Sequence, residues 1–112
     1  MCIFCKIIDG ELPANKIFEN DKVLAFYDIA PQAKVHILLI PKVHFADFES
    51  MQKEYVEYVT ECFVQIPNIV KLAGLENGYR VIINKGQDAG QLVPHLHMHI
   101  VGGQNLGNIV AK

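Results

Sequence analysis

One stretch decides the fold of this chain: Pro94-His95-Leu96-His97-Met98-His99-Ile100-Val101-Gly102-Gly103. Successive side chains of a β-strand point to opposite faces of the sheet. The run therefore predicts a strand with three imidazoles on one face and three apolar side chains on the other. An imidazole can act as nucleophile, acid, base or metal ligand near neutral pH. The alternative is a polar, solvent-facing edge, but three histidines in register before a glycine pair favour a functional site.

Composition limits what the rest of the chain can be. The 112 residues, 51% hydrophobic and 20% charged, predict a single packed domain over residues 1–112. A net charge of −2 excludes the basic surface that binds nucleic acid. No apolar run reaches the length of about 20 residues that a membrane span needs, and no signal peptide is visible. The three cysteines do not indicate a disulfide framework, so we expect a cytoplasmic protein.

Periodicity and turn residues predict the other elements. We expect a short helix over 2–9, a hairpin of strands 16–19 and 22–28, a buried strand over 35–40 and a strand over 79–84. Ser50 is the expected N-cap of a long helix that bends at Pro67 and ends at Gly74. The helix is expected to bury one face, formed by Met51, Tyr55, Val59, Cys62, Phe63, Ile66, Ile69 and Val70. One long helix on a meandering sheet is an α+β fold.

The segment Lys85–Gln91, just before the histidines, contains two glycines. Glycine lets backbone N–H groups approach an anion closely, as phosphate sites require. A turn-forming loop is the simpler interpretation of these residues alone. Beside a row of imidazoles, the loop suggests attack on phosphorus, with backbone donors stabilising charge on the phosphoryl oxygens.

The run His95–Val101 resembles the signature of the histidine-triad (HIT) nucleotide-binding proteins. Further blocks of the chain fall where the Hint-type branch of that family has its segments. These blocks are Ile3–Ile8, Glu11–Pro13, Ala25–Ile29, Pro31-Gln32, His36–His44, Gly78–Arg80 and Gly90-Gln91. The resemblance therefore covers nearly the whole chain.

The resemblance implies an antiparallel sheet of about five strands with one long and one short helix. It implies a homodimer in which the two sheets join into a continuous ten-stranded sheet. It also implies hydrolysis of nucleoside 5′-phosphoramidates, typically of AMP, through a nucleotidyl-phosphohistidine, with no cofactor needed for catalysis. Two alternatives stay open. One is another enzyme, a dinucleoside polyphosphate hydrolase or nucleotidyl transferase, and the other is a purine-nucleotide-binding module with low turnover.

Site residues carry over by position. His97 would be the nucleophile, His99 would contact the phosphate or leaving group, and His36 would support the catalytic imidazole. Asn84 and the backbone of Gly90-Gln91 would hold the phosphate, and Asp28 would bind the ribose hydroxyls. The base pocket would be lined by Ile3, Phe4, Ile7, Leu12, Phe26 and Ile29, which could equally be ordinary core residues.

Two cysteines and two remaining histidines form a second group. Cys2 and Cys5, in a Cys-x-x-Cys spacing, together with His44 and His95 make a complete tetrahedral zinc set. Some bacterial HIT proteins are similar in binding structural zinc with this set. The competing interpretation is a reduced thiol pair with His44 in a surface turn, and an open metal centre at the three alternating histidines is another. Cys62, on the buried helix face, is expected to be a core residue.

One residue departs from the family pattern. Many Hint-type enzymes carry a serine at the position of Leu92, where its hydroxyl is thought to assist the leaving group. Leucine cannot donate a hydrogen bond. The substitution predicts slower phosphoramidate hydrolysis in this chain.

Overall fold

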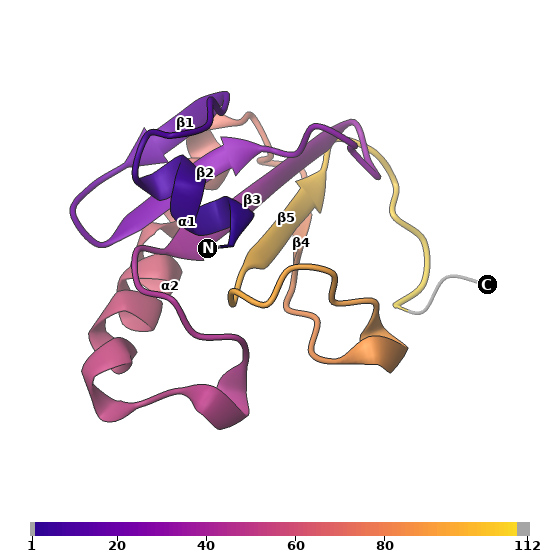
Figure 1. Ribbon diagram of the computed structural model, residues 1–112. Helices are drawn as coiled ribbons and strands as arrows, with labels where there is room; N and C mark the ends of the chain where they lie inside the picture. The colour runs from indigo at the N-terminus through magenta and orange to yellow at the C-terminus, as the bar shows by residue number, and fades with distance from the viewer. Residues whose placement is uncertain (1, 110–112) are drawn as a thin grey trace.

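The fold is one antiparallel sheet with a helix on each face. The computed structural model describes residues 2–109. The five strands lie in the order β1-β2-β3-β5-β4. Their bounds are Lys16–Glu19 (β1), Val23–Tyr27 (β2), Val35–Pro41 (β3), Tyr79–Ile82 (β4) and Met98–Gly102 (β5). Figure 1 shows the short helix α1 (Ile3–Ile8) and the long helix α2 (Val56–Leu72). The α+β class, the antiparallel sheet and the two helices are as predicted.

The β1–β2 hairpin forms around Asn20, as the sequence predicts. The Asn20 N–H donates to the Val23 carbonyl at 3.0 Å. Its side-chain Oδ1 accepts hydrogen bonds from the backbone N–H groups of Lys22 and Val23 at 2.9 and 3.0 Å. An asparagine that satisfies the turn amides in this way fixes the turn and hence the strand register.

Strands β2 and β3 are buried on both faces, because their side chains alternate between two cores. Val23, Ala25, Ile37 and Leu39 pack in the larger core, to which α2 contributes. Leu24, Phe26, Leu38 and Ile40 pack in a smaller core with Phe4 and Ile7 of α1. The continuous apolar run of β3 follows from this burial on both sides.

The long helix begins later than predicted. Ser50 is not its N-cap: the carboxylate of Asp47 accepts from both the N–H and the hydroxyl of Ser50, at 3.0 and 2.8 Å, and caps a short 3₁₀ turn over Phe48–Ser50. A second 3₁₀ turn, Lys53–Tyr55, precedes α2. Asp47 is an equally good capping residue. Its carboxylate accepts the hydrogen bond of the Ser50 hydroxyl, which was predicted to cap the long helix.

The buried face of α2 matches the predicted spacing only in part. Val59, Cys62, Ile66 and Ile69 are buried, and Cys62 is a core residue as expected. Phe63, predicted on the same face, is instead 52% exposed. Pro67 lies inside α2, and the helix ends where Gly74 takes a φ of +73°. The remaining predicted residues at the ends, Met51, Tyr55 and Val70, pack partly buried against the larger core.

The histidine stretch keeps its predicted alternation although only part of it is a strand. β5 begins at Met98, so His95 and His97 precede the ladder. Leu96, Met98 and Ile100 nevertheless lie in the larger core. The predicted strand over 79–84 similarly ends at Ile82.

Among residues 2–109, no helix has the length and apolar character needed to cross a membrane.

Candidate active site and metal site

The three histidines face the α1 side of the sheet. The ring of Phe4, from α1, makes edge contacts with His95 and His97 at centroid distances of 5.9 and 5.0 Å. His95 and His97 are buried, and His99 is half-buried. The polar, solvent-facing edge considered as an alternative is therefore excluded for this stretch.

His97 is held in one tautomer by its neighbour's backbone. Its Nδ1 lies 2.7 Å from the carbonyl oxygen of His95, which can only accept a hydrogen bond. Nδ1 therefore carries the proton, and Nε2 has a free lone pair. Burial lowers the pKa of His97 below its ordinary value, which keeps the ring neutral. A neutral imidazole with a free Nε2 is the form that can act as a nucleophile.

His36 and His99 form a chain of hydrogen bonds with a defined direction. The Gln32 N–H donates to His36 Nδ1 at 3.0 Å, so the proton of the His36 ring is on Nε2. His36 Nε2 lies 2.8 Å from His99 Nδ1 and donates to it. The proton of the His99 ring is then on Nε2. This site offers an N–H donor at His99, whereas His97 offers a lone pair, and the two rings are 4.9 Å apart.

Asp28 lies beside this chain. Its Oδ2 is 3.6 Å from His36 Nε2, and its Oδ1 accepts from the Ala30 N–H at 2.8 Å. Burial lowers the pKa of His36, and the Asp28 carboxylate opposes that effect. The sequence predicted Asp28 as a ribose ligand and did not predict this contact, because only the fold brings the end of β2 next to His36 in β3.

The loop before the histidines is closed by its own hydrogen bonds. The Gly90 and Gln91 N–H groups, predicted as phosphate donors, donate to the carbonyls of Gln87 and Gly86 at 3.0 and 3.1 Å. The Gln91 side chain accepts from the Gly86 N–H and donates to the Ala46 carbonyl. Neither predicted amide is free in this conformation. Within residues 2–109, the N–H of the next residue, Leu92, has no hydrogen-bond partner.

Asn84, predicted to hold the phosphate, and Leu92, which departs from the family pattern, lie at the two ends of this loop. Asn84 follows β4 and is half-buried. The Leu92 side chain is 92% exposed. The residues predicted to line the base pocket divide into two groups: Phe4, Ile7 and Phe26 are buried in the smaller core, and Ile3, Leu12 and Ile29 are exposed.

Cys2, Cys5, His44 and His95 come together as a second site, which we call the metal cluster. Five distances between their ligand atoms, Sγ of the cysteines and Nδ1 of the histidines, run from 3.2 to 3.7 Å. Tetrahedral zinc with bonds of about 2.3 Å to sulfur and about 2.0–2.1 Å to nitrogen separates its ligand atoms by about 3.3–3.8 Å. The four residues therefore fit a tetrahedral zinc ion.

The protonation of His95 suits a ligand. Its Nε2 donates to the Pro41 carbonyl at 2.9 Å, so the lone pair is on Nδ1, which faces the two thiols. A backbone carbonyl that fixes the ring in this way is the usual outer partner of a metal-bound histidine. Burial and the neighbouring Cys2 raise the pKa of the Cys5 thiol to about 11, so a metal must displace a proton there.

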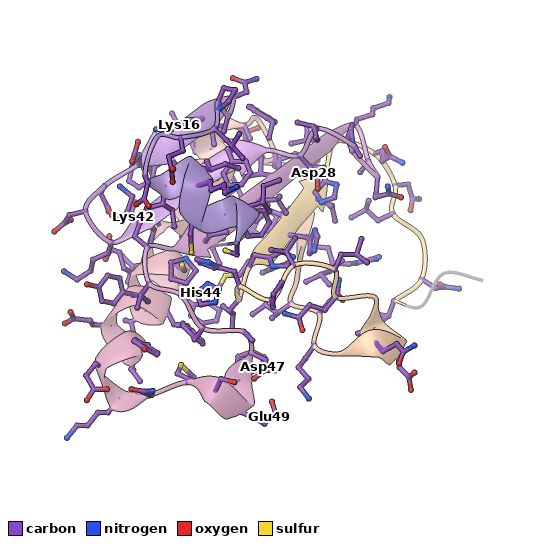
Figure 2. All side chains as sticks on the ribbon, viewed as in Figure 1. Lys16, Asp28, Lys42, His44, Asp47 and Glu49 are labelled. Carbon is purple, nitrogen blue, oxygen red and sulfur yellow. The ribbon has the colours of Figure 1, made fainter. Side chains whose placement is uncertain are left out.

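The five histidines thus divide between two sites. His95 and His44 belong to the metal cluster, whereas His36 and His99 form a separate group with Asp28. His97 lies beside that second group, with its ring centroid 4.9 Å from that of His99. In the described part of the chain, His95, His97 and His99 do not converge on one ion, which argues against an open metal centre there. Figure 2 shows His44 close to α1 and Asp28 well apart from it, toward the other end of the histidine stretch.

Fold and site together define a class: a small α+β protein with a row of buried imidazoles beside a two-cysteine, two-histidine cluster. Residues 9–106 match the HIT domain family. Protein HitA of Neisseria gonorrhoeae is 43% identical over 101 residues, covering 90% of this chain and 94% of HitA. The chain belongs to the HIT family.

Solved structures agree with this assignment. A histidine triad protein from Clostridium difficile is 45% identical with a TM-score of 0.89, over 96% of this chain and 94% of that one. A HIT family hydrolase from Legionella pneumophila is 39% identical with a TM-score of 0.89, over 96% of both chains. Both likenesses extend over nearly the whole chain.

The buried histidines predict that acid destabilises the fold. Burial, with His97 and His36 nearby, lowers the pKa of His99 from 6.5 to about 4. Between these values the unfolded chain binds more protons than the folded chain, so the free energy of unfolding falls as pH drops from 6.5 toward 4. Urea denaturation of metal-free protein across this range measures the slope. A His99→Asn variant is expected to show a shallower slope, and an unchanged slope would contradict the assignment to His99.

Proposed function

We propose that this protein hydrolyses nucleoside 5′-phosphoramidates of the AMP type through a covalent intermediate on His97. The observation that carries the proposal is the 2.7 Å hydrogen bond from His97 Nδ1 to the His95 carbonyl, which leaves Nε2 unprotonated in a buried ring. The Legionella relative is a HIT family hydrolase, which supports hydrolysis by this chain. The choice of a phosphoramidate rests on the Hint-type resemblance of the N-terminal blocks.

The reaction has two balanced steps. In the first, the lone pair of His97 Nε2 forms a bond to phosphorus while the phosphorus–nitrogen bond of the substrate breaks, and the departing amine takes up a proton from solvent. In the second, water attacks phosphorus and gives up a proton to solvent, the electron pair of the breaking His97–phosphorus bond returns to Nε2, and the nucleoside monophosphate leaves. The His99 Nε2–H, oriented by His36, donates a hydrogen bond to the phosphoryl oxygens or leaving group.

The other binding roles follow from charge and from free donors. Asp28 accepts hydrogen bonds from the ribose hydroxyls, because a carboxylate suits the sugar and would repel the phosphate. Asn84 and the free N–H of Leu92 serve the phosphate, in place of the engaged amides of Gly90 and Gln91. The apolar residues of α1 and of the β2 end contact the base.

Comparing three measurements tests this function. We expect turnover of adenosine 5′-phosphoramidate with a kcat/KM well above that for a diadenosine polyphosphate. The reverse order would favour the polyphosphate hydrolase or transferase, which uses the same adduct with another leaving group or acceptor. AMP binding by calorimetry with no turnover of either substrate would favour a nucleotide-binding module.

Leu92→Ser is expected to raise kcat for adenosine 5′-phosphoramidate by about tenfold, because the new hydroxyl can donate to the leaving group. The exposed position makes the change harmless to stability. Steady-state kinetics measure the effect, with Leu92→Ala as the matched control that removes the leucine without adding a donor. Equal rates for the serine and alanine variants would contradict a role for a hydroxyl here.

We also propose that the metal cluster binds one structural zinc ion. The ligand spacing and the His95 tautomer support zinc, and four protein ligands leave no open position for water. The ion would supply a rigid link between α1, the segment after β3 and the histidine stretch. In this scheme the metal takes part in no bond that forms or breaks during the reaction.

We propose further that the chain forms a homodimer. Val56, Phe63, Val64 and Leu72 of α2 are large apolar side chains that are about half exposed, and β4 lies at the edge of the sheet. A two-fold arrangement of α2 and β4 would cover this surface and continue the sheet. We expect Phe63→Glu to shift the sedimentation coefficient from dimer to monomer. Phe48→Glu, equally exposed but off α2, is the control, and a monomeric wild-type chain would contradict the dimer.

A further inference from the structure

The part of the chain that carries the nucleophile lies beyond the end of the sheet. The β3–β5 ladder begins at the pair Leu39–Met98, so the peptide between His95 and His97 is not held by strand pairing. The Leu96 N–H donates instead to the Phe45 carbonyl at 2.7 Å. The position of this segment therefore depends on contacts outside the ladder.

Those contacts come from residues of the metal cluster or from their neighbours. Phe45, which anchors Leu96, directly follows His44. His95 is fully buried, and its ring is fixed by Pro41 at Nε2 and faces the two cysteines at Nδ1. Both anchors of the segment thus lead back to the metal cluster.

The same residue, His95, also determines the state of the nucleophile. Its backbone carbonyl accepts the hydrogen bond from His97 Nδ1 that leaves Nε2 free. If that carbonyl shifted, the Nδ1–H would lose its hydrogen-bond acceptor. The ring could then adopt the other tautomer, whose Nε2 is protonated and cannot attack phosphorus. The side chain of His95 faces the metal cluster while its backbone faces the active site.

We propose that the metal cluster positions the nucleophile: metal bound to His95 fixes the carbonyl that holds His97 in its reactive tautomer. Resting on the proposed hydrolase function, this makes His95 a positioning residue and makes metal occupancy a control on the rate. In the competing interpretation, the metal cluster only holds α1 against the sheet and has no effect on His97.

His44→Ala tests the coupling, because His44 is an exposed ligand that does not contact His97. Zinc content, the ¹⁵N chemical shifts of the His97 ring without nucleotide, and kcat are measured together. We expect the zinc-loaded wild type to show a single Nδ1–H tautomer. The variant should lose zinc, show mixed tautomers and lose about 10–100-fold in kcat with KM changed less than about threefold.

His44→Cys supplies a replacement ligand and is expected to restore zinc, the tautomer and kcat together. Glu54→Ala, an exposed change in the segment between β3 and α2, should leave all three unchanged. A metal-free, folded chain that keeps the single tautomer and the wild-type kcat would overturn the proposal. Global unfolding on metal loss would also overturn it, because the metal would then serve the whole fold. If wild type turns over no phosphoramidate, the hydrolase proposal fails while the tautomer comparison still decides the coupling.

Discussion

His97→Ala is expected to lower kcat for adenosine 5′-phosphoramidate by at least about 1,000-fold, the loss typical of removing a covalent nucleophile. The buried ring has its Nδ1 committed to the His95 carbonyl, and Nε2 is the atom left for phosphorus. No other described histidine combines burial with a free, unprotonated ring nitrogen outside the metal cluster: His99 Nδ1 accepts from His36, and His36 Nδ1 accepts from Gln32. The measurement is steady-state kinetics at saturating substrate.

The same experiment separates chemistry from folding. His97→Ala leaves the His95 carbonyl exposed to water at the vacated space, so its fold and AMP affinity are checked by circular dichroism and calorimetry. His99→Ala is the matched comparison, a neighbouring imidazole with a donor role, and should cost less, about 10–100-fold. Quenching wild type at alkaline pH should trap AMP on a peptide containing His97. Turnover that survives in His97→Ala, or an adduct on another residue, would rule out the covalent mechanism.

The alternating histidines and the apolar runs allowed much of the fold to be predicted. Period-two alternation at Leu96, Met98 and Ile100 predicted their burial, and Asn20 predicted the hairpin. The start of α2 could not be predicted, because Asp47 and Ser50 are both good caps and the choice depends on a side-chain contact between them. The exposure of Phe63 could not be predicted either. Helical periodicity indicates which face of a helix is apolar, but not how wide a strip of that face contacts the sheet.

The clustering of the four proposed metal ligands could be predicted from residue types, spacing and the family resemblance, and the structure brings them together. The role of His97 rests on the family resemblance, and the protonation of the histidines could not be predicted from the sequence. The tautomers depend on backbone partners distant in sequence, such as Pro41 for His95. For the same reason, no sequence pattern predicted that the amides of Gly90 and Gln91 donate hydrogen bonds within their own loop. Loop closure is set by three-dimensional distances that no local pattern encodes.

Cys5→Ser is expected to remove most of the zinc from a wild-type chain that carries one ion. The Cys5 sulfur lies 3.2–3.7 Å from the ligand atoms of the three other residues, so it occupies a full vertex of the tetrahedron. A serine hydroxyl is a poor ligand for zinc in such a set. A ligand at 1,000 times its dissociation constant adds about 4 kcal/mol to stability, so the variant should lose at least about 10 °C in Tm.

Elemental analysis of protein purified without chelator, together with calorimetric Tm, checks both expectations. Cys62→Ala is the matched control, since it removes a thiol that is buried in the core among α2 contacts and far from the cluster in sequence. That variant should keep one zinc per chain while losing about 1 kcal/mol to a small cavity. Zinc loss in Cys5→Ser but not in Cys62→Ala would assign the ion to the cluster. A wild-type chain without zinc would mean that the thiols instead form a reduced pair, with protons shared between Cys2 and Cys5 in place of the metal.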